Sequence, residues 1–67
     1  MLEVTHVRGW TFFPRLFRTG DEWQGGVDVL TDRCRSITRH LCVHTREDEE
    51  DALVDAIVDS LRLAEMV

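Results

Sequence analysis

Two short polar turns divide the first part of the chain into three segments with strand-like patterns. The first turn, RTGDE at residues 18–22, supplies Gly20 for a positive φ and Asp21 for a local side-chain hydrogen bond. The second turn is DRCR at residues 32–35. Connections this short join antiparallel neighbours. A three-stranded antiparallel meander is therefore predicted, with strands at residues 3–18, 23–31 and 36–45.

The first predicted strand, residues 3–18, carries apolar side chains on both faces. Side chains alternate along a strand, which places Phe12 with Leu16 and Phe13 with Phe17. Gly9 is expected to bend this strand. Pro14 lacks an amide donor, and it indicates an edge strand or a bulge.

The second and third predicted strands also alternate. In the second, one face carries Trp23, Val27, Val29 and Thr31, and the other carries Gln24, Asp28 and Leu30. The Gly25-Gly26 pair marks either a bulge or a close approach of another backbone. In the third, Ile37, Leu41 and Val43 share a face with Arg39, opposite an expected outer face of Thr38, His40, Cys42 and His44. A register slip of one residue would bury the histidines instead.

The segment after the third strand has the pattern of an amphipathic helix. Thr45 is the expected N-cap, with Asp48 completing a variant capping box, and the acids that follow suit the helix dipole. Leu53, Ile57 and Leu61 repeat every four residues beside Ala56, Ser60 and Ala64, with Val54, Val58 and Leu63 widening the stripe. The repeat is expected to pack on the sheet, but the widened stripe exceeds what three strands need, and the apolar side chains left exposed favour a homodimer. The expected far side carries Asp51, Asp55, Asp59 and Arg62.

These elements predict an α+β fold: a three-stranded antiparallel β-meander followed by one C-terminal α-helix, β-β-β-α, with the helix packed on one sheet face. Residues 1–67 are expected to form a single small domain. A chain of this size buries only about 60% of its unfolded surface, so a metal or a partner subunit would add needed stability. One helix covers one face, so the other must stay hydrated, bind a partner or pair with a second copy.

Charge is strongly segregated along the chain. Residues 1–46 hold seven arginines and five acids, whereas residues 47–67 hold eight acids and one arginine, within a total charge of −5. A net negative field repels nucleic acids and anionic membranes. The N-terminus lacks signal-peptide character, and no apolar run approaches the ~20 residues that span a bilayer. We therefore expect a cytoplasmic protein with reduced thiols and no membrane partner.

His40, Cys42 and His44 are candidate metal ligands, because residues i and i+2 project to the same side of a strand and both ligand types suit zinc. His6 or Cys34 could supply a fourth ligand. We favour an outer strand face here and predict no metal or cofactor. The sequence also lacks a nucleophile elbow, a phosphate-binding glycine loop and an H-E-x-x-H motif, which predicts a protein without catalytic activity.

Arginines and aromatics interleave in the predicted sheet, an arrangement that can contact phosphates and stack bases. A strand from Trp23, an arginine-rich turn, a strand ending at Thr45 and a helix opening with acids resemble the last strands and helix of AP2-type and integrase-arm DNA-binding domains. The resemblance covers residues 23–57. Asp32 in the turn and the negative net charge depart from that pattern, so no family residue roles are carried over. The alternative nucleic-acid-binding set is Arg15, Arg18, Arg33, Arg35, Arg39 and Trp23.

The preferred prediction is a small acidic protein–protein interaction or regulatory module, an adaptor or inhibitor, that forms a homodimer. Its partner protein would present a basic surface to the acidic helix face, which would steer association. The predicted acidic contacts are Glu47, Asp48, Glu50, Asp51, Asp55 and Asp59. The predicted apolar contacts of the strand edge are Phe12, Phe13 and Phe17.

Overall fold

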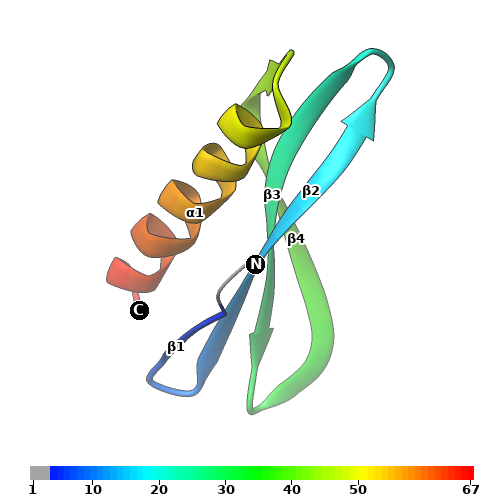
Figure 1. The fold of residues 1–67 in the computed structure, drawn as a ribbon. Helices are drawn as coiled ribbons and strands as arrows, with labels where there is room; N and C mark the ends of the chain where they lie inside the picture. The colour runs from blue at the N-terminus through cyan, green and yellow to red at the C-terminus, as the bar shows by residue number, and fades with distance from the viewer. Residues whose placement is uncertain (1–3) are drawn as a thin grey trace.

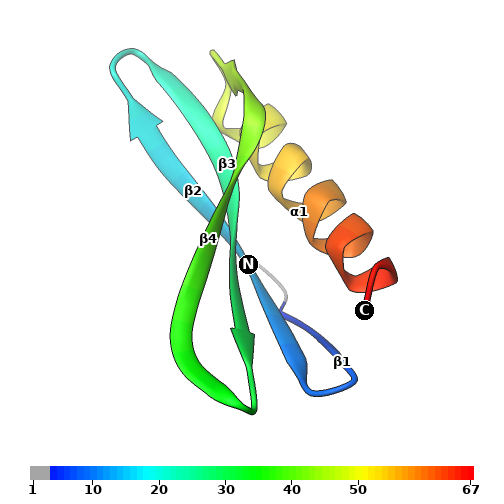
Figure 2. The same cartoon turned by 180° about the vertical axis from the view of Figure 1, so that it is seen from behind.

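A four-stranded antiparallel sheet with one helix across one face forms the fold (Figure 1, Figure 2). The computed structural model describes residues 4–67, without the side chains of residues 34–36. The elements are β1 (Thr5–Val7), β2 (Trp10–Thr19), β3 (Glu22–Thr31), β4 (Cys34–Arg46) and α1 (Glu49–Glu65). The strands lie in chain order. The α+β class, the antiparallel meander and the C-terminal helix agree with the sequence prediction.

The predicted first strand is in fact a hairpin of two strands, so the sheet has four strands instead of three. Arg8 and Gly9 have φ values of 50° and 80°, and Val7 pairs with Trp10 across them. A two-residue turn with two positive φ values suits the right-handed twist of a hairpin. The sequence prediction recognised a bend at Gly9 but missed the reversal, because the first turn residue is arginine.

The short β1 leaves most of β2 at the sheet edge. Strand β1 pairs only as far as Phe12 on β2, and no described residue pairs with the outer side of β2 beyond it. Pro14 lies in this uncovered part, opposite Val27 of β3. A missing amide donor costs little at an edge, which explains why proline is tolerated there.

The prediction of which face of β4 is buried was wrong: the face expected to lie in the core is exposed, and the face expected in solvent lies beneath α1. Cys42 is buried and His40 half-buried on the side of α1, whereas Ile37, Leu41 and Val43 are 60%, 50% and 87% exposed on the other side. The register causes this, because His40 pairs with Val27, whose side chain is fully buried beneath the helix. Strict alternation was predicted correctly, but it does not say which face the helix covers.

Helix α1 packs through its small residues. Ala52, Ala56 and Ser60 are buried, whereas the predicted core residues Ile57 and Leu61 are 39% and 53% exposed. The helix begins later than predicted: Asp48 is the N-cap position, without a side-chain capping bond, and Thr45 still belongs to β4. Small side chains face the sheet because the two backbones approach closely there.

The Gly25-Gly26 pair of β3 makes this approach possible. A Cβ on Gly25 would lie 2.9 Å from the backbone nitrogen of Ala56 and would also meet the carbonyl oxygen of Ala52. The pairing of β3 with β4 shifts register between Gln24 and Gly26. Both sequence alternatives, a bulge and a close backbone approach, therefore occur at this pair. Around it the core is formed by Phe12, Val27, Cys42, Ala52 and Ala56.

Candidate functional site

The sheet face opposite α1, here called the open sheet face, brings several predicted site residues together. Its members alternate with the residues beneath the helix and share one side by strand register. They are Thr11, Phe13, Arg15, Phe17 and Thr19 of β2, Glu22, Gln24, Asp28 and Leu30 of β3, and Ile37, Arg39, Leu41, Val43 and Thr45 of β4.

An ion-paired trio lies at the centre of the open sheet face. Asp28 Oδ2 accepts a hydrogen bond from Arg15 Nε at 3.0 Å, and Asp28 Oδ1 accepts one from Arg39 Nε at 2.8 Å. The Asp28 side chain is only 6% exposed, whereas both arginine side chains are about half exposed. One carboxylate thus joins three strands, and the trio keeps a net charge of +1.

The electrostatics of the trio follow from this geometry. The hydrogen bond from Arg39 lowers the pKa of Asp28, with the charge of Arg15 acting in the same direction, and these effects outweigh the burial that raises it. The same bond raises the pKa of Arg39. The trio therefore stays ionised at neutral pH and presents two oriented guanidinium groups.

Phe17 is fixed beside the trio. Its ring lies beneath the Arg39 guanidinium, 4.6 Å from ring centroid to Cζ, in a cation–π contact. A Cβ on Gly26 would approach the same ring to 2.8 Å. The missing side chain of Gly26 therefore lets the ring lie on the β3 backbone. Gly25 does the same for α1 on the opposite face of the sheet.

Exposed aliphatic side chains extend the open sheet face along β4. Ile37, Leu41 and Val43 follow at intervals of two or four residues and are all at least half exposed. Together with Phe13 and Phe17 they form a mixed aliphatic and aromatic surface around the charged trio. Contiguous apolar surface of this kind marks binding sites in water-exposed proteins.

The candidate metal ligands named from the sequence do not gather around a common point. His40 Nε2 lies 3.0 Å from Asp59 Oδ2, and the Cys42 thiol donates a hydrogen bond to the same carboxylate. His44 is exposed. His6 lies in β1, at the opposite edge of the sheet from β4, and contacts Thr11. Within the part of the chain that the structure describes, no group of three potential ligands is close enough to hold a metal ion. The Cys34 side chain lies outside the described residues.

Asp59 acts as an anchor between α1 and β4. Burial raises the pKa of Asp59, but the hydrogen bonds from Cys42 and His40 lower it. The net shift of the pKa is downward. Burial, with Asp59 nearby, raises the pKa of the Cys42 thiol to about 12. A buried thiol with this pKa is a poor nucleophile.

The six predicted acidic contacts divide into two groups. Asp55 is paired with Arg46 at 2.8 Å, and Asp59 contacts β4 as described above, so neither forms the predicted free face. The remaining four are exposed at the start of the helix: Glu47, Asp48, Glu50 and Asp51. Among the predicted apolar contacts, Phe12 is 1% exposed and belongs to the core. Glu50 and Asp51 belong to α1, which covers the sheet face opposite Phe13 and Phe17.

The alternative nucleic-acid set is also divided. Arg15 and Arg39 lie on the open sheet face, but Arg18 stacks over Trp23 at 5.0 Å on the side of α1. Arg33 lies in the β3–β4 turn, and the side chain of Arg35 lies outside the described residues. No single described surface collects this set.

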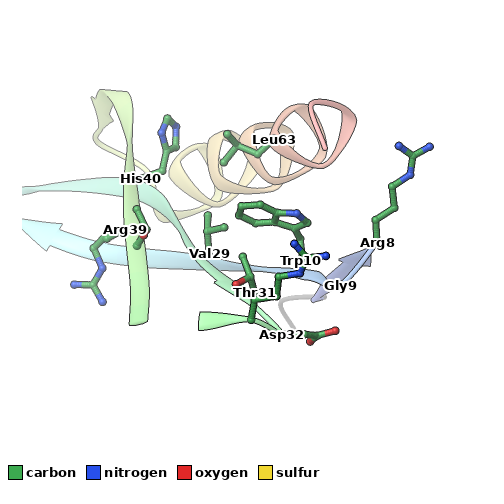
Figure 3. Close-up of a pocket in the computed structure, with 11 residues that line it drawn as sticks. Arg8, Gly9, Trp10, Val29, Thr31, Asp32, Arg39, His40 and Leu63 are labelled. Atoms are coloured by element: carbon green, nitrogen blue, oxygen red, sulfur yellow. The ribbon is translucent and has the colours of Figure 1, made fainter. Parts of the chain in front are cut away.

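A hollow of about 1100 Å³ lies beside the end of α1. Trp10, Val29 and Leu63 supply apolar walls, and Thr38 and His40 supply polar ones. In Figure 3 the Trp10 indole lies between Leu63 and the strands, while Arg39 points to the other side of the sheet from His40. The hydrogen bond from the Asp32 amide to the Gly9 carbonyl, 2.9 Å, joins the two hairpins that flank it. Trp10, which is 37% exposed, was not among the predicted site residues.

The outward face of α1 is a second apolar surface, and sequence analysis had placed two of its members, Ile57 and Leu61, against the sheet. Its residues are Val54, Ile57, Val58 and Leu61, with exposed fractions of 56%, 39%, 38% and 53%. They lie on one side of the helix by their spacing of three and four residues. Small residues occupy the sheet contact instead, so these larger side chains are left in solvent.

Comparisons with protein-family models, with curated proteins and with solved structures find no match to this chain. Among the described residues, no helix combines the length and the apolar character needed to cross a membrane.

Proposed function

We propose that this chain is a non-catalytic protein-interaction module, an adaptor or inhibitor, that binds a partner protein through the open sheet face. One observation carries the proposal: the exposed row of Ile37, Leu41 and Val43 continues into Phe17 and the Arg39 guanidinium. Aromatic and arginine side chains are enriched in the centres of protein interfaces. Ion pairing with Asp28 fixes Arg39 before a partner arrives, which reduces the entropy lost on binding.

The acidic start of α1 has a separate role in this proposal. Glu47, Glu50 and Asp51 lie away from the open sheet face and are exposed. They steer a partner with a basic surface toward the molecule, an effect that salt weakens. Charge reversal at these three positions is expected to slow association, most strongly at low ionic strength, with little change in the dissociation rate.

A paired-variant capture experiment tests the sheet face. The double substitution Leu41→Asp and Val43→Asp places two charges on exposed positions and should abolish partner capture without changing the circular dichroism spectrum. Met66→Asp is the matched control, because Met66 is 79% exposed and lies outside both apolar faces. A partner retained by the double variant would show that binding occurs elsewhere.

A second candidate function uses the same face to bind single-stranded nucleic acid. Phe13 on β2 and the Arg39 guanidinium, which Phe17 supports from below, form a platform on which bases could stack. Titration of labelled RNA and DNA at two salt concentrations separates the two functions. Micromolar binding that collapses with salt and is lost on Phe17→Ala would assign the face to nucleic acid.

A further inference from the structure

Two apolar surfaces of this molecule differ in charge. At the centre of the open sheet face the Arg15–Asp28–Arg39 trio keeps a net charge of +1, and Glu22 lies on the same face at the β2–β3 turn. The outward face of α1, formed by Val54, Ile57, Val58 and Leu61, is bordered by three acids and by Arg62, so its border carries a net negative charge. These acids are Glu50, one turn before Val54, Asp51 beside it, and Glu65, one turn after Leu61.

We propose that copies of this chain associate head to tail, with the outward face of α1 of one copy seated on the open sheet face of the next. The inference rests on the proposed function, because it uses the same sheet face and names a second copy of the chain as its partner. Arg15 and Arg39 then approach Glu50, Asp51 or Glu65 of the neighbouring helix.

The geometry of the sheet supports a helix as the occupant. The covered side of this sheet already holds α1, lying along β2 and β3 (Figure 1). A helix of 17 residues is about 25 Å long, and the long axis of the molecule is 37 Å. The open sheet face is therefore long enough for the whole outward face of a second α1.

Charge selects the head-to-tail arrangement over two symmetric ones. Two open sheet faces packed together would bring four arginines close around carboxylates that are already paired. Two outward helix faces packed together would oppose two borders that each hold three acids and one arginine, Arg62, so most of the facing charges would repel. The sheet-to-helix contact instead places the guanidinium groups of Arg15 and Arg39 opposite a net acidic border while it covers apolar surface.

The arrangement has a consequence for assembly size. A head-to-tail contact uses a different surface on each partner, so every copy keeps one free sheet face and one free helix face. Such interfaces propagate into chains or close into rings. The average mass should therefore rise with protein concentration past twice the chain mass, and added salt should lower it.

Sedimentation of two face variants and their mixture tests the proposal. The sheet variant carries Leu41→Asp and Val43→Asp, and the helix variant carries Val54→Lys and Leu61→Lys. All four positions are exposed, so both variants should keep the wild-type circular dichroism spectrum, and Met66→Asp should assemble like wild type. Each variant alone should be a monomer. An equal mixture should form a dimer and nothing larger, because only one pair of intact surfaces remains.

Three results would overturn the inference. They are a monomeric wild type from micromolar to millimolar concentration, an assembly that stops at the dimer, and a mixture of variants that stays monomeric. A wild type that stops at the dimer would indicate a two-fold interface. A monomeric wild type would remove the second copy as partner, while the capture experiment with the sheet variant would still decide the proposed function.

Discussion

Gly25 of β3 lies directly under the backbone of Ala56 in α1. A Cβ placed on Gly25 would come within 2.9 Å of the Ala56 nitrogen, 3.1 Å of its Cβ, and against the Ala52 carbonyl oxygen. Two of these three atoms belong to backbone, so no side-chain rotation can relieve the contact. This relationship fixes which sheet face the helix covers, and it thereby leaves the opposite face open.

The substitution Gly25→Ala should destabilise the fold strongly. The helix must move away from β3, which typically costs about 1–3 kcal/mol in the free energy of unfolding, and backbone contacts favour the upper end. Gly26→Ala is the comparison, because a Cβ there would meet backbone only at 3.0 Å, at the His40 carbonyl oxygen, and its nearest contact at 2.8 Å is the side chain of Phe17. Urea unfolding should give the larger loss for Gly25→Ala. Equal stabilities for wild type and Gly25→Ala would show that the two backbones do not approach this closely.

The same relationship explains what could be predicted from the sequence. The turn at Gly20, the alternation of β3 and β4 and the presence of the C-terminal helix follow from local patterns, and all are found. The buried face of β4 was predicted wrongly, because Ile37 and Leu41 are more apolar than His40. Which face is covered depends on the contact at Gly25, between segments far apart in the chain.

The helix shows the same limit of local patterns. Apolar residues occur on two sides of α1, and hydropathy favours Ile57 and Leu61 over Ala56 and Ser60. Close packing over Gly25 selects the small residues instead. The pairing of Asp55 with Arg46 and of Asp59 with His40 is likewise a tertiary contact, so these acids could not be distinguished from the exposed ones by composition.

Substitutions on the two sides of α1 test which side packs against the sheet, the Leu61 side predicted from the sequence or the Ala56 side seen in the structure. Leu61→Gln should change the free energy of unfolding by less than about 0.5 kcal/mol, because Leu61 is 53% exposed. Ala56→Leu should cost about 1–3 kcal/mol by overpacking. Thermal unfolding of dilute monomer provides the measurement. The opposite ranking would place Leu61 against the sheet, as sequence periodicity suggested.

Removal of the Asp28 carboxylate should reduce stability in a pH-dependent way. The neutral amide introduced by Asp28→Asn cannot pair with both arginines as a charged group, and hydrogen bonds to charged groups contribute about 1.5–3 kcal/mol. The half-exposed arginines regain water, so the loss should lie near the lower value. Urea unfolding at neutral pH measures it.

Lowering the pH should narrow the difference in the free energy of unfolding between wild type and Asp28→Asn. The pKa of Asp28 is lowered in the folded protein from the usual 3.8, so its contribution is fully present above that pH. The contribution is lost as pH falls through the folded value, because protonation then favours the unfolded chain. Unfolding curves from pH 7 down to the acid limit should therefore converge. A constant difference at all pH values would contradict the ion pair.

The Cys42 thiol gives the opposite pH dependence. Burial raises its pKa from 9.0 to about 12 in the folded protein. Stability from the protonated thiol is fully present below pH 9 and is lost as pH rises toward 12, because the unfolded chain ionises first. In a Cys34→Ser background, iodoacetamide should label Cys42 at neutral pH only as fast as the protein unfolds. Cys42→Ala should flatten the alkaline decline in stability. Rapid labelling of the folded protein would show that the thiol is accessible to solvent, and that α1 does not cover this side of β4.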